Sequence, residues 1–146
     1  MPPRRNRTAA HTTVGDVFRV ELGPDPADAE ELRSAICTMA ERGGFEGRVD
    51  DLALAVAEVV ANAREHGRPP VVVTARLEGR LVVEVQDAGG GFDQDALMPD
   101  SPPSHGGHRG RGLWIARQLV DVFHVRSGPQ GTVARLELSP EPHIGA

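Results

Sequence analysis

Leu52–Gly67, LALAVAEVVANAREHG, is the stretch on which the prediction of the fold depends. Its apolar residues recur at steps of three and four, which is helical spacing. They are Leu52, Val56, Val59, Val60 and Ala63. No proline interrupts the pattern, and Gly67 stands where a helix commonly ends. We predict a helix over about residues 48–65, with Asp50 or Asp51 capping its start.

Two polar residues, Glu58 and Asn62, interrupt the apolar pattern of this helix. They are four positions apart, so they share one helix face, and His66 continues the same line one turn later. A carboxylate and an amide that project together from an apolar helix suit a site that holds a metal ion and a base in fixed geometry. The alternative is an ordinary amphipathic helix whose polar edge holds Glu and Asn, with a structural role for His66.

The bulk composition limits the class of protein. A chain of 146 residues fits one domain with its own core, and its net charge of -5 argues against a general nucleic-acid binder. No apolar run is long enough to span a bilayer, and none follows the basic N-terminus as in a secretory signal. We therefore expect a cytoplasmic protein with no membrane or direct nucleic-acid partner. The single cysteine, Cys37, cannot form an internal disulfide.

The other periodic segments predict a helical layer on a sheet. In chain order they are a strand at 14–22, a helix from Pro26 or Asp28 through Ala40, hairpin strands at 71–77 and 80–86, a helix at 113–123, and hairpin strands at 122–127 and 132–138. This order favours an α+β fold, a two-layer α/β sandwich with a mixed, mostly antiparallel sheet and helices on one face. It is not the βαβ alternation in which Gly89–Gly91 would be a dinucleotide fingerprint.

Asp87 ends a predicted strand and is followed at once by Ala88 and by Gly89–Gly91. Glycine lets a flat ligand approach the backbone closely. A carboxylate is an acceptor only, so it suits an amino group such as that of adenine. The alternative is a tight turn at the strand exit, because Asp and Gly are also turn residues.

The segment between this strand and the next helix has two parts. Residues 94–107 hold three prolines and few apolar residues, and a loop of this length is usually functional or mobile. Gly110-Arg111-Gly112-Leu113 then opens a helix, where exposed N–H groups bind anions, and Arg109 adds charge for phosphate. The alternative is a flexible loop exit with solvated arginines. His105 and His108 have no carboxylate or Cys partners, which favours solvated side chains over metal ligands.

Together the three motifs resemble those of the GHKL (Bergerat-fold) ATPase superfamily, and within it the bacterial anti-sigma factor serine/threonine kinases of the SpoIIAB and RsbW type. Glu58–Gly67, EVVANAREHG, is similar to the N box of that family. Asp87–Phe92, DAGGGF, is similar to its first glycine box, and Gly110–Leu113, GRGL, to its second. Gly131-Thr132 resembles the Gly-Thr of the last strand. The resemblance covers residues 14–138, within a predicted ATPase domain of residues 13–140 between tails at 1–12 and 141–146.

The resemblance implies a role for each matched position. Glu58 would be the general base toward a serine or threonine hydroxyl, and Asn62 would coordinate a Mg²⁺ ion that bridges the ATP phosphates. Asp87 would accept a hydrogen bond from the adenine amino group, and residues 94–107 would form the ATP lid. The other nucleotide-binding positions that it implies are Gly89, Gly91, Gly110, Arg111, Gly112, Leu113 and Thr132.

The resemblance also implies a function and partners. The protein would be a homodimeric kinase that sequesters a sigma factor and phosphorylates a STAS-type anti-sigma factor antagonist, with ATP and Mg²⁺ as cofactors. Two alternatives stay open at this point. One is a nucleotide-gated binding module with little or no kinase activity, and the other is the kinase of a regulatory switch unrelated to sigma factors.

Overall fold

The computed structural model describes residues 11–14, 16–89 and 111–140. Its strands are β1 (His11–Val14), β2 (Val17–Leu22), β3 (Val71–Leu77), β4 (Leu81–Asp87), β5 (Val122–Gly128) and β6 (Gly131–Leu138). Its helices are α2 (Pro26–Arg42), α3 (Val49–His66), α5 (Arg111–Leu119) and the 3₁₀ turn η1 (Glu46–Arg48). None of these helices has the length and apolar character needed to cross a membrane, as far as the described ranges go.

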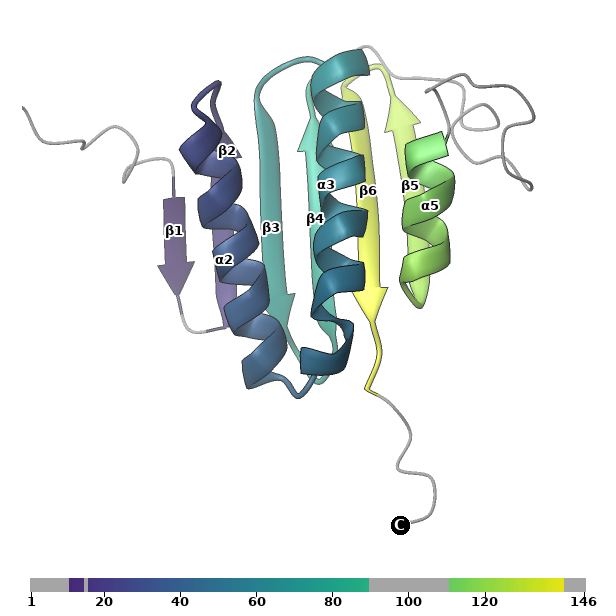
Figure 1. Cartoon of the computed structure of the whole chain (residues 1–146). Helices are drawn as coiled ribbons and strands as arrows, with labels where there is room; N and C mark the ends of the chain where they lie inside the picture. The colour runs from purple at the N-terminus through teal and green to yellow at the C-terminus, as the bar shows by residue number, and fades with distance from the viewer. Residues whose placement is uncertain (1–10, 15, 90–110, 141–146) are drawn as a thin grey trace, which may run out of the picture.

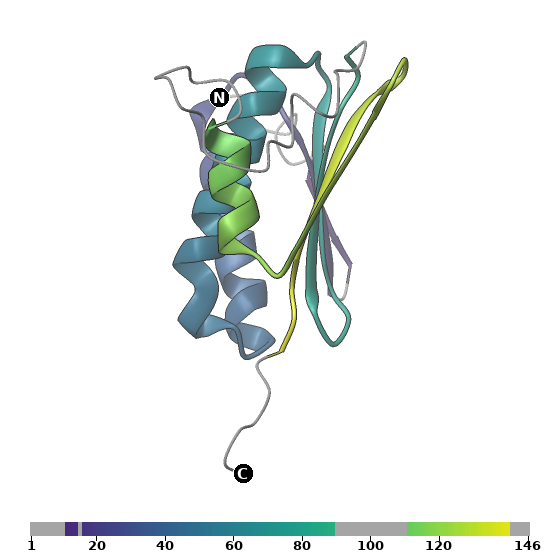
Figure 2. The same cartoon turned by 90° about the vertical axis from the view of Figure 1, so that its right-hand side faces the viewer.

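The six strands form one sheet in the order β1-β2-β3-β4-β6-β5, and each neighbouring pair is antiparallel. The helices cover one face of this sheet, with α3 between α2 and α5 (Figures 1 and 2). The predicted two-layer α+β sandwich is therefore confirmed. The core lies between the two layers, where alternate residues of β3, β4 and β6 point toward the helices and are buried.

Helix α3 is the central element of the helical layer. Its buried residues are Leu52, Ala55, Val56, Val59, Val60 and Ala63, which include the whole stripe that the sequence predicts. Full burial of a Val or Leu side chain stabilises the fold by about 1.5–3 kcal/mol. This stripe therefore fixes the rotation of α3, and with it the direction in which Glu58 and Asn62 project.

The helix starts differ in how they are capped. Asp25 caps α2, since its carboxylate accepts a hydrogen bond from the Ala27 N–H at 2.9 Å. Helix α3 begins at Val49, directly after η1, and has no side-chain cap. The prediction that Asp50 or Asp51 caps α3 was wrong, because both residues lie inside the first turn of this helix. There they act on the positive end of the helix dipole instead.

The two ends of the described chain also differ from the prediction. The predicted strand at 14–22 is a hairpin, β1 and β2, in which Val14 pairs with Val17. Strand β1 includes residues 11 and 12, which belong to the predicted N-terminal tail at 1–12. The helix predicted at 113–123 ends at Leu119, and Phe123 belongs to β5. It ends there because the Asp121 N–H donates to the Glu137 carbonyl, which draws the chain into the sheet.

Arg48 fastens the C-terminal end of α5 to the start of α3. One guanidinium nitrogen lies 2.8 Å from Asp121 Oδ2, and the other donates to the Leu119 carbonyl at 3.1 Å. The Asp121 carboxylate also accepts from the Ser139 N–H at 2.7 Å. These bonds satisfy a carbonyl at the helix end and hold α5 beside α3.

The face of the sheet opposite the helices carries a network of charged side chains. Glu137 is only 6% exposed, and its carboxylate lies 2.6 Å from Arg135 Nε and 3.4 Å from the Arg80 guanidinium. Arg135 also lies 3.4 Å from Glu84. The hydrogen bond to Glu137 raises the pKa of the Arg135 guanidinium above its ordinary value. The buried carboxylate is thus paired, as a buried charge must be.

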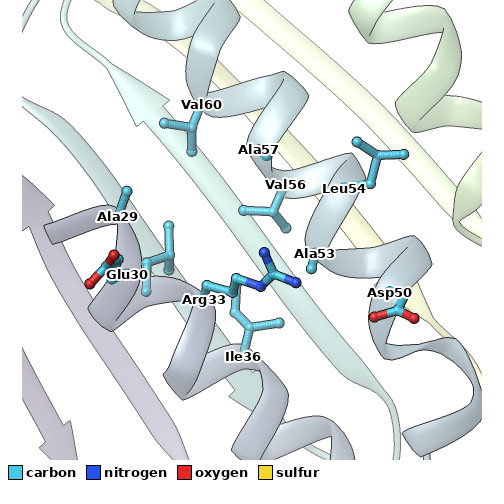
Figure 3. A pocket seen from close by; sticks show the side chains of 11 residues that line it. Ala29, Glu30, Arg33, Ile36, Asp50, Ala53, Leu54, Val56, Ala57 and Val60 are labelled. Atoms are coloured by element: carbon cyan, nitrogen blue, oxygen red, sulfur yellow. The ribbon is translucent and has the colours of Figure 1, made fainter. Parts of the chain in front are cut away.

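A groove with a cavity volume of about 520 Å³ separates α2 from α3 (Figure 3). Ile36, Val56 and Val60 line it, and small side chains such as Ala53 and Ala57 leave the space open. None of the predicted site residues lines this groove. The site therefore has to be sought on the other side of α3, where α5 packs.

We expect Arg48→Ala to destabilise the fold by about 1–2 kcal/mol, because it removes a charge-assisted bond and leaves a helix-end carbonyl without its donor. Urea unfolding measures the change as a shift in midpoint at constant slope. Arg33→Ala is the control, because it removes an exposed arginine from the middle of α2. Equal midpoints for the two variants would contradict the role assigned to Arg48.

Candidate functional site

Asp87 ends β4 with its side chain buried, and three glycines from separate segments surround it. A Cβ on Gly67 would lie 2.4 Å from Asp87 Cγ, and one on Gly131 would lie 2.0 Å from the Asp87 carbonyl oxygen. The Gly89 N–H donates to Asp87 Oδ1 at 2.8 Å. No side chain fits at Gly67 or Gly131, so Gly67 allows the end of α3 to approach the carboxylate and Gly131 allows β6 to approach the Asp87 main chain.

A small hollow lies beside Asp87, between α3, α5 and the sheet. Its polar lining consists of Asn62, Asp87 and Thr132, and Leu113 of α5 closes it with apolar neighbours. Its cavity volume is about 10 Å³, which is room for about one water molecule. A purine is too large for this hollow, so it would enter only if the hollow widens where Leu113 of α5 closes it.

A larger hollow of about 360 Å³ lies on the other side of Asn62. Glu58, Asn62, Glu65 and His66 line it from α3, and Gly112 lines it from α5. A Cβ on Gly112 would lie 2.9 Å from Glu58 Oε2, so this glycine lets the first turn of α5 approach the carboxylate. His66 Nε2 lies 3.8 Å from Glu65 Oε1. Asn62 thus lines both hollows.

The structure brings together most of the residues that the sequence singles out. Those that line the hollows or contact Asp87 are Glu58, Asn62, Asp87, Gly89, Gly112, Leu113 and Thr132. Gly91, Gly110 and the predicted lid at 94–107, with His105 and His108, lie outside the described residues. Arg111 is the first residue of α5, but its side chain lies outside them too.

Sequence reasoning missed the part that Gly67 takes in the site. We interpreted Gly67 as the end of α3, yet its closest approach is to the Asp87 side chain. Gly131 also lies against Asp87, because Asp87 pairs with Thr132, the next residue, across β4 and β6. Strand register is the signal that could have found Gly131, because it places residue 131 next to Asp87; Gly67 follows a helix, and no strand pairing locates it.

The larger hollow offers oxygen donors that suit Mg²⁺, from the Asn62 amide and the Glu58 carboxylate. Among the described residues, no group of three or more His, Cys, Asp and Glu side chains could hold a metal ion. A cation at the Asn62 amide would therefore take most of its ligands from phosphate and water. Mg²⁺ is usually bound in this way, with one or two protein ligands and substrate phosphates.

A family model for the histidine kinase-like ATPase domain matches residues 22–138, so the chain belongs to this family. The structure is similar to that of the RsbU and RsbW domains of a Mycobacterium tuberculosis protein, with a TM-score of 0.60 and 22% identity over 86% of this chain and 32% of that one. It is also similar to the Acinetobacter baumannii histidine kinase AdeS, with a TM-score of 0.52 and 8% identity over 75% and 64% of the two chains.

At these identities the two likenesses show a shared fold alone. The chain spans about a third of the Mycobacterium tuberculosis chain, so the activity of that whole protein does not transfer to it. Among curated proteins, no significant sequence match was found. Family membership confirms the GHKL-type resemblance and implies that the chain binds ATP.

Asp87→Asn should weaken ATP binding by about 10- to 100-fold, because it replaces the acceptor of a charge-assisted bond by an amide that also donates. Trp114, the only tryptophan, lies in α5 two residues after Gly112, so its fluorescence should report a change at α5 when ATP binds. Titrations with ATP, repeated by calorimetry, measure the affinity.

The matched control for this titration is Asp51→Asn, which changes an exposed aspartate in the first turn of α3. It should bind ATP as the unmodified protein does. Unchanged ATP affinity in Asp87→Asn would contradict the assignment of Asp87 to the nucleotide site.

Proposed function

We propose that the protein is a Mg²⁺- and ATP-dependent protein serine/threonine kinase that acts as an anti-sigma factor. The observation that supports it best is the placement of Glu58 and Asn62. Both project from one face of α3 into the larger hollow, where Gly112 brings the first turn of α5 against Glu58. This arrangement sets a base and a cation ligand beside the end of a helix.

The residues of the two hollows divide the binding of a nucleotide between them. The Asp87 carboxylate would accept from the adenine amino group in the small hollow, and the Asn62 amide would hold the cation. Glu58 and Glu65 give the larger hollow negative charge, so a triphosphate without a cation would meet like charge there. This supports a requirement for Mg²⁺ at the site.

Glu58 is the residue to which we assign proton transfer. When bound, MgATP supplies the phosphoryl group, and such transfers need positioning and charge neutralisation more than covalent chemistry. The Glu58 carboxylate would take the proton of an incoming serine or threonine hydroxyl. Its neighbours Val59 and Val60 are buried in the core, so the backbone that carries Glu58 is held rigidly.

The partners follow from the resemblance of the motifs to those of the anti-sigma factor kinases. The protein would bind a sigma factor, and would phosphorylate a STAS-type antagonist on a hydroxyl. The unphosphorylated antagonist would compete for the kinase and release the sigma factor. We place this cycle in the cytoplasm and assign it to a homodimer.

A second candidate is a nucleotide-gated binding module with little or no kinase activity. The observation that favours it is the size of the hollow beside Asp87, which a purine can enter only if the hollow widens where Leu113 of α5 closes it. Such a widening would change the surface around α5 when ATP binds. A partner that recognises this surface would then respond to the nucleotide without any transfer.

Glu58→Gln separates the two candidates. For a kinase, transfer of phosphate from radiolabelled ATP to a STAS-domain protein should fall by at least about 100-fold, which is the usual contribution of a general base. The ATP affinity of the variant, measured by calorimetry, should stay within about threefold of that of the unmodified protein. The labelled phosphate on the STAS-domain protein should be stable to acid, because a phosphate ester on a hydroxyl resists acid.

The control for this assay is Glu41→Gln, at an exposed glutamate near the end of α2. It should transfer phosphate at the rate of the unmodified protein. Full transfer by Glu58→Gln would refute the role of Glu58. An acid-labile phosphohistidine on this chain would refute the hydroxyl kinase.

A further inference from the structure

The face of the sheet that points away from the helices is not covered by any helix of the described chain (Figure 2). Two of the three exposed large apolar side chains among the described residues belong to this face. Val17 begins β2 and is 38% exposed, and Val122 begins β5 and is 41% exposed. Two exposed valines alone are ordinary on a protein surface, so the choice of a partner depends on the pattern of side chains between them.

Strand pairing arranges the side chains of this face in rows that cross β2, β3, β4, β6 and β5 in that order. Residues that pair across antiparallel strands lie on the same face of a sheet. The row farthest from Asp87 is Val17, Arg76, Val82, Glu137 and Val122. The row nearest Asp87 is Glu21, Val72, Gln86, Val133 and Arg126. When either row is read backwards, the apolar and polar positions stay the same and the charges change sign.

This pattern matches a second copy of the chain that is rotated by 180° about an axis parallel to β4. Such a rotation places β2 of one copy over β5 of the other, β3 over β6, and β4 over itself. Glu21 then faces Arg126 of the other copy, and Val17 faces Val122 of the other copy. Two sheets that pack face to face keep their strands within about 30° of each other, so these rows meet at the same level.

A rotation axis that runs across the strands gives a much poorer match. It would place Glu21 over Val17 of the other copy, and Arg126 over Val122. Charged side chains would then be removed from water against valine, without a partner of opposite charge. The axis along the strands instead sets opposite charges against each other and apolar side chains against each other, as in complementary interfaces.

The row between these two lacks the pattern, because Glu84 lies on the axis and meets Glu84 of the other copy. Within each copy, however, Glu84 lies 3.4 Å from Arg135. Two carboxylates and two guanidinium groups therefore alternate around the axis. The outer rows are left to select the orientation of the two copies.

We propose that this face of the sheet is the interface of the homodimer, with the two-fold axis along β4. The pair of Glu21 and Arg126 forms twice across the axis and orients the copies. Both side chains are exposed, and no ion pair within the described chain involves either of them. This inference rests on the homodimer of the proposed function and names its contact surface.

Glu21 and Arg126 of one chain are too far apart to interact with each other. They lie on β2 and β5, which are separated by three strands. Four strand spacings amount to about 19 Å, and salt screens exposed charges beyond about 8 Å at physiological ionic strength. A coupling between substitutions at the two positions therefore acts between copies of the chain.

Sedimentation equilibrium of the full chain tests this interface. The unmodified protein should have twice the mass of one chain, which is 15.6 kDa. Glu21→Arg alone and Arg126→Glu alone each set like charges opposite each other twice, and should raise the dissociation constant of the dimer at least about tenfold. The double variant restores opposite charges, so its dissociation constant should return to within about threefold of that of the unmodified protein. A double variant that dissociates as the single variants do would overturn the proposal.

Val122→Asp tests the apolar contact, and Leu54→Asp is its matched control. Leu54 is 49% exposed on α3, in the helical layer. Val122→Asp should weaken the dimer, and Leu54→Asp should leave its dissociation constant unchanged. The reverse result would overturn the proposal, because it would place the contact between copies on the helices.

Cross-linking keeps the test valid if a charge variant does not fold. Val17→Cys and Val122→Cys, each combined with Cys37→Ser, are mixed and treated with a short bis-maleimide, because stacked sheets lie about 10 Å apart. The mixture should give a covalent dimer that neither variant gives alone, and absence of this product would contradict the arrangement. If the unmodified protein is a monomer, this inference and the proposed homodimer fail together, whereas ATP binding and phosphate transfer are judged by their own assays.

Discussion

The buried carboxylate of Asp87 is the constraint on which the rest of the site depends. A carboxylate that is removed from water has to be hydrogen-bonded, and the Gly89 N–H supplies one bond. The end of α3, at Gly67, approaches this carboxylate without a side chain, and the start of β6, at Gly131, approaches the main-chain carbonyl of the same residue. Three segments that are distant in the sequence therefore meet at Asp87, and a larger residue at Gly67 or Gly131 would force them apart.

The two helices that flank the site are held in different ways. Helix α3 is fixed along its length by its buried stripe, so Glu58 and Asn62 keep their separation and direction. Helix α5 is held by Arg48 at its C-terminal end and contacts Glu58 through Gly112 at its N-terminal end.

The sequence predicted those parts of the molecule that are set by local patterns. The stripe of α3 follows from helical periodicity alone, and the predicted hairpin strands at 71–77 and 80–86 correspond to β3 and β4. The end of α5 could not be predicted, because apolar spacing continues past Leu119. What ends the helix is the pairing of Asp121 with Glu137, which is distant in the sequence. The approach of Gly67 to Asp87 was missed for the same reason.

The narrow hollow beside Asp87 has a consequence for affinity. If the closed form predominates, the measured affinity for a nucleotide equals the affinity of the open form reduced by the fraction of molecules that are open. The packing of Leu113 against the sheet then contributes to the dissociation constant, although Leu113 carries no polar group. Substitutions that loosen this packing would strengthen nucleotide binding and would lower the stability of the fold. Evolution can therefore adjust the nucleotide concentration at which the protein is half saturated through residues of the core.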